Sequence, residues 1–103
     1  MQLSDIKTLL EGTGLPAAYR MWPEGAAPDP PYLVFFETGN NNFSADGIVY
    51  HKAPRIAVEL YTDKKEPETE SLIEDALSAF FWTKDETYID SEQLHEIRYE
   101  IEI

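Results

Sequence analysis

The sequence predicts an α+β fold, in which a mainly antiparallel sheet of four to five strands carries two helices packed on one face. Two observations support this prediction. The last segment, Leu94 to Ile103, alternates apolar and charged residues with the period of two that a half-buried strand shows. The middle segment, Ala53 to Trp82, begins with the same period and changes to a helical one. The chain of 103 residues is expected to form a single domain, because no repeat, linker or low-complexity tract divides it.

The first third of the chain is expected to contain one helix and two strands. Leu3 to Leu10 has the spacing of a short amphipathic helix, with Ser4 as its N-cap. Ala17 to Trp22 alternates like a strand, and Pro23 to Pro31 is too rich in proline for a regular element. Tyr32 to Glu37 is apolar on both faces, which is typical of a central strand.

A polar loop is expected from Thr38 to Asp46, because the segment TGNNNFSAD is rich in residues that favour turns. Phe43 would lie exposed at its tip, which indicates a surface that a partner covers. A loop packed on itself is the alternative. Gly47 to Tyr50 then continues as a short strand, so that a strand pair brackets the loop.

The segment from Ala53 to Trp82 is expected to build the core. Its strand directs Ile56, Val58 and Leu60 to one face, and Arg55, Glu59 and Tyr61 to the other. Its helix begins at Pro67, which fits the first helical turn because it needs no N–H there. The apolar stripe of this helix is expected to consist of Leu72, Ile73, Ala76, Leu77, Phe80 and Phe81.

The remaining strands follow that helix. Tyr88 and Ile89 are expected to form a short extended piece before a turn at Asp90 to Glu92. The last strand then has a core face and a charged face. The core face consists of Ile97, Tyr99, Ile101 and Ile103, and the charged face of Glu96, Arg98, Glu100 and Glu102.

The composition excludes several classes of function. Twenty acidic residues against eight Lys and Arg give a formal net charge of −12, which argues against a protein that grips nucleic acid by its phosphates. The acidic excess lies mainly after Lys65 and indicates either a solubilising face or a surface that repels or mimics nucleic acid. The absence of cysteine excludes disulfides and thiolate metal sites. With no membrane-length apolar run and no signal-peptide pattern, we expect a soluble intracellular protein.

No catalytic, metal or cofactor site is predicted. His51 and His95 lack the short spacing of metal ligands, and Ser44 lies outside any nucleophile elbow. The run Asn40 to Asn42 lacks the acidic spacing of a calcium loop. We therefore expect a binding or assembly protein rather than an enzyme. Its candidate partner surface comprises Asn40, Asn41, Asn42, Phe43, Arg55 and Tyr61, and its acidic outer face comprises Glu59, Glu96, Glu100 and Glu102.

Four segments together resemble the minor tail or tail-completion proteins of long-tailed bacteriophages, in the tail terminator group. They are NNFSAD from Asn41 to Asp46, the YHK that ends at Lys52, VELYTDKKEPETESLIEDAL, and the ending TKDETYIDSEQLHEIRYEIEI. Tail terminators are small α+β subunits that form a hexameric ring on the tail tube. The resemblance implies that this chain stops tube polymerisation and forms the docking face for the head connector.

The resemblance also implies the partners. They are other copies of the chain in a ring, the tail tube protein and the head-connector protein, in the host cytoplasm during assembly and then in the virion tail. The free subunit can be monomeric in dilute solution, because the like charges of its copies oppose association. We expect the acidic outer face to line the lumen, where DNA would pass without binding. The alternatives are a head-closure or adaptor protein of the phage neck, and an acidic inhibitor that mimics DNA.

Overall fold

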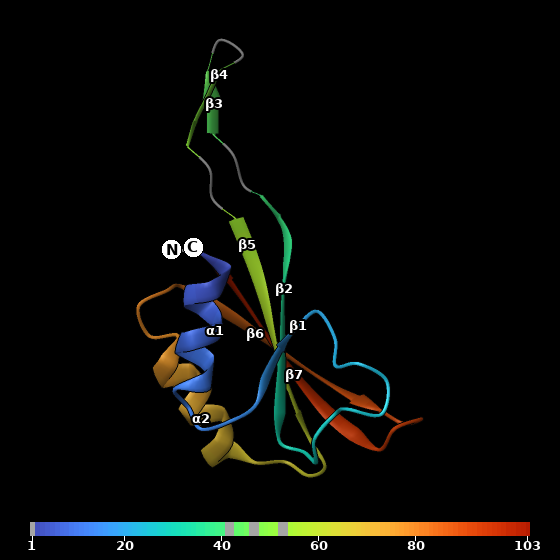
Figure 1. Cartoon of the computed structure of the whole chain (residues 1–103). Helices are drawn as coiled ribbons and strands as arrows, with labels where there is room; N and C mark the ends of the chain where they lie inside the picture. Colours follow the sequence, from blue (N-terminus) through green and yellow to red (C-terminus); the bar gives the residue numbers. More distant parts are fainter. Residues whose placement is uncertain (1, 41–42, 46–47, 52–53) are drawn as a thin grey trace.

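The computed structural model describes residues 2–40, 43–45, 48–51 and 54–103. Five strands form one sheet in the order β1-β2-β5-β7-β6, and β3 and β4 form a second sheet of two strands (Figure 1). The predicted α+β class is confirmed. The elements are α1 Leu3–Glu11, β1 Ala17–Tyr19, β2 Tyr32–Asn40, β3 Phe43–Ala45, β4 Ile48–His51, β5 Pro54–Thr62, α2 Pro67–Ala76, β6 Trp82–Ile89 and β7 Leu94–Glu102.

The larger sheet is mostly antiparallel, as predicted, with one parallel pair at its edge. Strand β1 runs parallel to β2, whereas β2, β5, β7 and β6 are antiparallel to their neighbours. Strand β5 lies at the centre, with β2 on one side and β7 on the other. This position explains its apolar character, because its backbone is paired on both edges and its core-facing side chains are covered.

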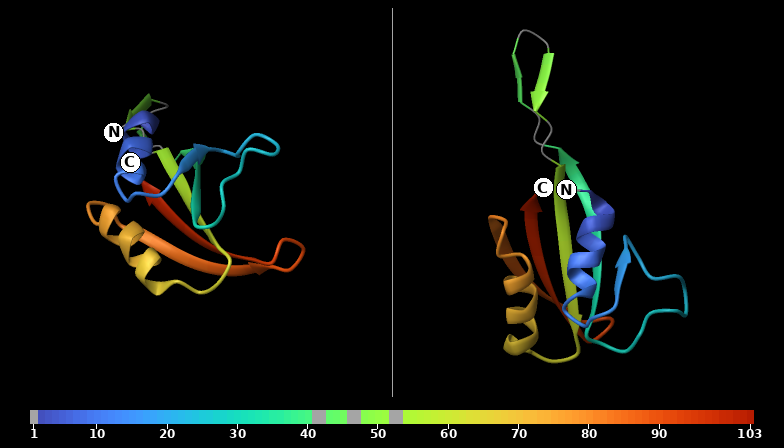
Figure 2. Two further views of the ribbon diagram at one scale, coloured as in Figure 1. Left: turned by 60° about the horizontal axis from the view of Figure 1, so that its bottom comes forward. Right: turned by 60° about the vertical axis from the view of Figure 1, so that its left-hand side comes forward.

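One apolar cluster holds the helices to the sheet. Ile6 and Leu10 of α1 and Ile73 and Leu77 of α2 are fully buried in the same cluster as alternate residues of the strands. The strand members of the cluster are Ala17, Leu33, Phe35, Ile56, Val58, Leu60, Ile97, Tyr99 and Ile101. Figure 2 shows α1 and α2 side by side. Each large aliphatic side chain buried in this way contributes roughly 1.5–3 kcal/mol.

Both helices differ at their ends from the sequence prediction. Helix α1 has Gln2, not Ser4, as its N-cap, and the backbone N–H of Gln2 donates a 2.7 Å hydrogen bond to Asp5 Oδ2. This contact is half of a capping box, which satisfies donors that the first helical turn leaves free. Helix α2 begins at Pro67 as predicted but ends at Ala76, so that the expected stripe is cut short.

The apolar stripe of α2 is therefore narrower than predicted. Ile73 and Leu77 are buried, but Leu72 is exposed and Phe81 is 90% exposed. The sheet contacts only the side of α2 on which Ile73 and Leu77, four residues apart, lie. Phe80 and Phe81 come after the end of the helix. Phe80 packs at the margin of the core, whereas Phe81 points away from it.

Three strand predictions need correction. Strand β1 ends at Tyr19 rather than Trp22, because Arg20 takes a left-handed backbone conformation (φ 71°) that turns the chain away. Strand β6 runs from Trp82 and pairs along its whole length with β7, so the extended piece is longer than Tyr88 and Ile89. The expected loop 38–46 is partly strand, since β2 continues to Asn40 and Phe43 begins β3.

Candidate assembly surface

The sheet face opposite the core carries the charged residues of the two central strands. We call this surface the outer face. The register places Arg55 opposite Glu102, Glu59 opposite Arg98, and Tyr61 opposite Glu96. Directly opposed residues of antiparallel strands lie on the same side of a sheet. The outer face is thus defined by Arg55, Ala57, Glu59 and Tyr61 of β5, and Glu96, Arg98, Glu100 and Glu102 of β7.

The outer face is less acidic and less accessible than its sequence suggests. Arg98 lies 3.7 Å from Glu59 and 3.3 Å from Glu100, so its charge offsets carboxylates on both sides. Glu59 is only 8% exposed, whereas Glu96 and Glu100 are half-buried and Glu102 is exposed. The structure brings all four glutamates to one face. Its positive charges make that face mixed rather than uniformly negative.

Tyr61 joins two of these glutamates. Its Oη lies 2.9 Å from Glu96 Oε2 and 3.0 Å from Glu59 Oε1. A phenol has one proton to donate, so the second carboxyl completes the arrangement only by donating a proton of its own. Burial, and next the charge of Glu96, raise the pKa of Glu59. These effects disfavour the ionised form of Glu59.

Aromatic side chains cover the end of the outer face beside the loop that follows β1. Tyr32 stacks on Tyr61 at 5.2 Å between ring centroids, and Trp22 meets Tyr32 edge-on at 6.3 Å. They line a cavity of about 260 Å³ with Arg20 and Glu92. The buried Nε1 of Trp22 has no hydrogen-bond partner in the described part of the chain. Burial, and then the charge of Glu92, raise the pKa of Tyr32.

Two guanidinium groups flank one ring on the same face. Arg20 and Arg98 each place their guanidinium carbon 5.7 Å from the centroid of the Phe36 ring. Such contacts contribute roughly 0.5–1 kcal/mol each at exposed sites. They fix Arg98 between Phe36 and the glutamates of β7, and they link the outer face to the segment after β1.

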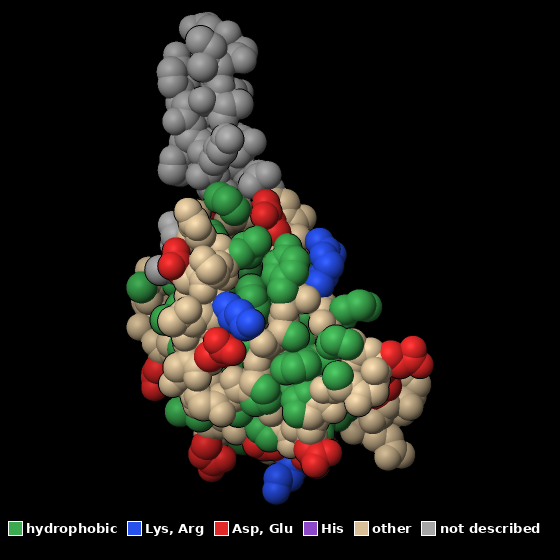
Figure 3. Space-filling model, viewed as in Figure 1, with side chains coloured by type: hydrophobic (Ala, Val, Ile, Leu, Met, Phe, Trp, Pro, Cys, Tyr) green, Lys and Arg blue, Asp and Glu red, His purple; other side chains and the backbone are tan. Residues whose placement is uncertain are grey.

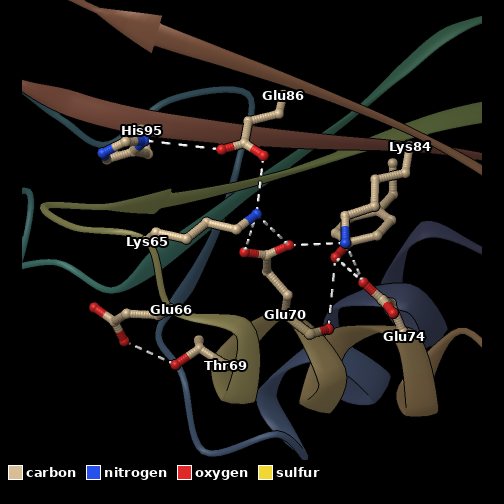
Figure 4. A network of polar contacts seen from close by, with 9 residues as sticks. Lys65, Glu66, Thr69, Glu70, Glu74, Lys84, Glu86 and His95 are labelled. Atoms are coloured by element: carbon tan, nitrogen blue, oxygen red, sulfur yellow. Dashed lines mark hydrogen bonds and ion pairs between the residues drawn. The ribbon is translucent and has the colours of Figure 1, made fainter.

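A separate polar network attaches α2 to the sheet (Figure 4). Glu70 is only 3% exposed, and its carboxylate lies 2.8 Å from Lys65 and 2.7 Å from Lys84. Lys84 also lies 2.7 Å from Glu74, which accepts a 2.7 Å hydrogen bond from Tyr99 Oη. This network has a structural explanation, since it satisfies charges that α2 brings over β6 and β7.

The same network shifts several pKa values. Burial alone would raise the pKa of Glu70, but the hydrogen bonds from Lys65 and then Lys84 outweigh it and hold that pKa below its usual range. Burial also acts to raise the pKa of Glu74. The hydrogen bond from Lys84 outweighs burial, so that the pKa of Glu74 is lowered. The hydrogen bond to Glu70 is the main reason why the pKa of Lys65 is raised. Burial, followed by the hydrogen bond to Glu74, raises the pKa of Tyr99.

The predicted partner surface is divided by the structure. Arg55 and Tyr61 lie on the outer face near opposite ends of β5. Asn40 ends β2 and Phe43 begins β3, whereas Asn41 and Asn42 lie outside the described residues. The sequence reasoning missed Phe81, which it assigned to the helical stripe. No glycine or proline between Leu77 and Phe81 signals the earlier end of the helix.

Other classes of site receive no geometric support in the described part of the chain. There, no three His, Cys, Asp or Glu side chains come together to hold a metal ion. His95 lies edge-on to Tyr88 at 4.9 Å and 3.9 Å from Glu86, which is a contact within the β6–β7 pair. None of the helices, as far as the chain is described, is long and apolar enough to cross a membrane.

Comparison with known proteins does not assign the chain to a family, since no family model and no curated protein matches its sequence.

Proposed function

We propose that this protein is a structural subunit of a long-tailed bacteriophage that caps the tail tube as a ring, in which six copies are expected. The ring ends tube polymerisation and presents the docking face for the head connector. The proposal rests on the sequence resemblance described above, together with one structural observation: the strands β3 and β4 form a ribbon that stands apart from the body of the subunit.

The β3–β4 ribbon is the part of the chain that we expect to meet neighbouring copies. Its strands, Phe43–Ala45 and Ile48–His51, pair with each other in a separate sheet, and Figure 1 shows them beyond the ends of β2 and β5. An isolated two-stranded hairpin is at best marginally stable in water. A subunit that is built to meet neighbours on a ring would supply the missing contacts, because ring interfaces join different surfaces of identical copies.

The charge of the subunit is compatible with a passage for DNA. Each copy carries a formal net charge of −12, so a ring would repel rather than hold the phosphates of DNA. Glu96, Glu100 and Glu102 remain our candidates for residues that face the lumen. Glu59 serves that role less well, because it is buried beside Arg98.

Co-expression with the tube protein encoded by the same genome tests the proposal. We expect short tubes that carry a ring of this protein at one end in negative-stain images, whereas tube protein alone should polymerise without a length limit. A charge-reversed triple variant, with Glu96, Glu100 and Glu102 changed to Lys, should still cap tubes but lower the yield of infectious particles. Matched Lys substitutions at Glu24, Glu66 and Glu68 control for the change in net charge. Tubes of unchanged length, without bound protein, would refute the proposal.

The same preparation separates the alternatives. A head-closure or adaptor protein would remain with filled heads and leave the tube ends bare. An inhibitor that mimics DNA would instead bind a host DNA-binding enzyme tightly and in a salt-sensitive manner. Arg55 and Arg98 interrupt the carboxylates of the outer face, which disfavours a phosphate-like array there.

A further inference from the structure

Strand β2 has a free edge beyond the point where β1 ends. The three residues of β1 pair only with Leu33, Val34 and Phe35 of β2, which continues to Asn40. Arg20 donates its backbone N–H to the Phe35 carbonyl and then turns away. The backbone groups of Leu33 and Phe35 point to this edge, so by strand alternation those of Glu37 do too. No strand in the described part of the chain pairs with Glu37 there.

An apolar groove lies directly beside this free edge. It has a volume of about 290 Å³ and is lined by Leu3, Ser4 and Lys7 of α1, by Tyr19 of β1 and by Phe35 of β2. Tyr19 meets Phe35 edge-on at 5.4 Å and is itself 43% exposed. Figure 3 views this side of the molecule and shows apolar side chains gathered beside α1. A groove next to an open strand edge is the arrangement that accepts an extended segment as an added strand.

The β3–β4 ribbon has the chemistry of such a segment. Strand β4, Ile48–His51, reads IVYH and is rich in residues that favour strands. Neither ribbon strand contains Asp, Glu, Lys or Arg, although the chain as a whole carries a net charge of −12. The ribbon can therefore approach another acidic copy without the repulsion that opposes contact between the bodies. With four residues, β4 fits within the free stretch of β2 from 36 to 40.

We propose that β4 of one copy adds to the free edge of β2 in a second copy, beside the groove between α1 and β1. This inference rests on the proposed ring, for which it names the contact between neighbours. The contact joins different surfaces of the two copies, as a ring requires. It also covers the ribbon and the groove at once.

The other open edge of the sheet is a poorer acceptor. Among the strands of the described residues, β6 has only β7 as a neighbour, but its exposed middle carries Lys84, Asp85 and Glu86. Charged side chains on an edge strand oppose the addition of another strand. Lys84 and Glu86 are in addition engaged with α2 and Lys65. The free part of β2 has a single charged residue, Glu37, and an apolar groove at its side.

Two pairs of variants test the acceptor surface. Glu37→Pro removes the backbone N–H that would bond the added strand. It removes no hydrogen bond to β5, since this N–H faces the free edge, where proline is tolerated. Glu37→Gln is its control, since it removes the charge and keeps the N–H. Ser4→Arg places a long side chain at the groove, and Thr8→Arg adds the same charge to α1 outside the groove lining. The three substituted side chains are outside the buried core, so far-ultraviolet circular dichroism of all four variants should remain native.

A ribbon-less protein tests the donor. Asn40 pairs with Pro54, so a short flexible Gly-Ser linker can replace residues 41–53 and join β2 to β5. This protein keeps the acceptor surface and lacks the donor. The full chain with Glu37→Pro keeps the donor and lacks the acceptor. Each alone should be monomeric, and an equimolar mixture should form a one-to-one pair.

Native mass spectrometry at about 0.15 M ionic strength, where screening acts beyond ~8 Å, gives the readout. We expect the natural chain, Glu37→Gln and Thr8→Arg to self-associate, and Glu37→Pro and Ser4→Arg to do so about tenfold more weakly or worse. Self-association of the ribbon-less protein, a monomeric natural chain or failure of the mixed pair would overturn the inference. A ribbon-less protein that still caps tubes would overturn the inference alone, whereas absence of capping by the natural chain would refute the proposed function.

Discussion

The contrast between Leu77 and Leu72 gives the sharpest test of how α2 is attached. Leu72 lies within α2, and Leu77 directly follows the last residue of that helix. Leu77 is fully buried, whereas Leu72 is 47% exposed. Leu77→Ala removes three carbons from the cluster that joins α2 to the sheet. The lost transfer free energy and the cavity left behind together cost about 2–5 kcal/mol for a buried leucine.

That loss is large relative to the total. A domain of this size has a free energy of unfolding of roughly 5–15 kcal/mol, and each kcal/mol corresponds to about 4–8 °C in Tm. Leu77→Ala should thus lower Tm by at least about 10 °C. Leu72→Ala should change the free energy of unfolding by less than about 1 kcal/mol, because its side chain loses little contact.

Urea unfolding followed by circular dichroism at 222 nm measures both variants, with the natural chain as reference. The midpoints should separate clearly, with Leu72→Ala close to the natural chain. Equal losses for the two variants, or a loss below about 1 kcal/mol for Leu77→Ala, would refute the burial pattern of α2.

Further predictions concern charge and exposure. The pKa of Glu70 is lowered in the folded chain, so the stability that Glu70 contributes is present above its unfolded pKa and is lost as pH falls through the folded pKa. Glu70→Gln should therefore cost roughly 1–3 kcal/mol of unfolding free energy at pH 7. It should also flatten the acid limb of a profile of Tm against pH. The pKa of Glu59 is raised in the folded chain, so the stability that Glu59 contributes is present at low pH and is lost as pH rises through the folded pKa. Between pH 4 and pH 7, the Tm of Glu59→Gln should therefore rise relative to the Tm of the natural chain. An opposite trend would contradict the raised pKa. Phe81→Ser should change the free energy of unfolding by no more than about 0.5 kcal/mol in urea titrations, and a larger loss would show that the ring is covered.

Much of the fold could be predicted because strand alternation is a local property. The pattern of Ile56, Val58 and Leu60 against Arg55 and Glu59 sorts β5 into two faces, and the structure has that sorting. Strand β6 escaped prediction because TKDETY has no apolar alternation and becomes a strand only by pairing with β7. The end of α2 escaped because Leu77, Phe80 and Phe81 continue the helical spacing beyond Ala76, although the helix has ended and Phe81 is exposed.

The candidate site shows the same division. Sequence spacing placed Glu59, Glu96, Glu100 and Glu102 on one face, but it counted each as an exposed negative charge. Alternation along β7 already placed Arg98 beside Glu96 and Glu100. Its approach to Glu59 and the contacts of Tyr61 with two glutamates depend on the register between β5 and β7. Register is set by contacts between residues far apart in the chain, so no local pattern contains it.

The sequence by itself determined the fold class, the core faces of β5 and β7, the start of α2 at Pro67 and an acidic composition without cysteine. These properties follow from periodicity and composition, which act over a few residues. Only the tertiary structure decided the strand order, the buried position of Glu70, the exposure of Phe81 and the free edge of β2 beside an apolar groove. Each of these depends on which distant segments pack together, and that is settled by burial and pairing across the whole chain.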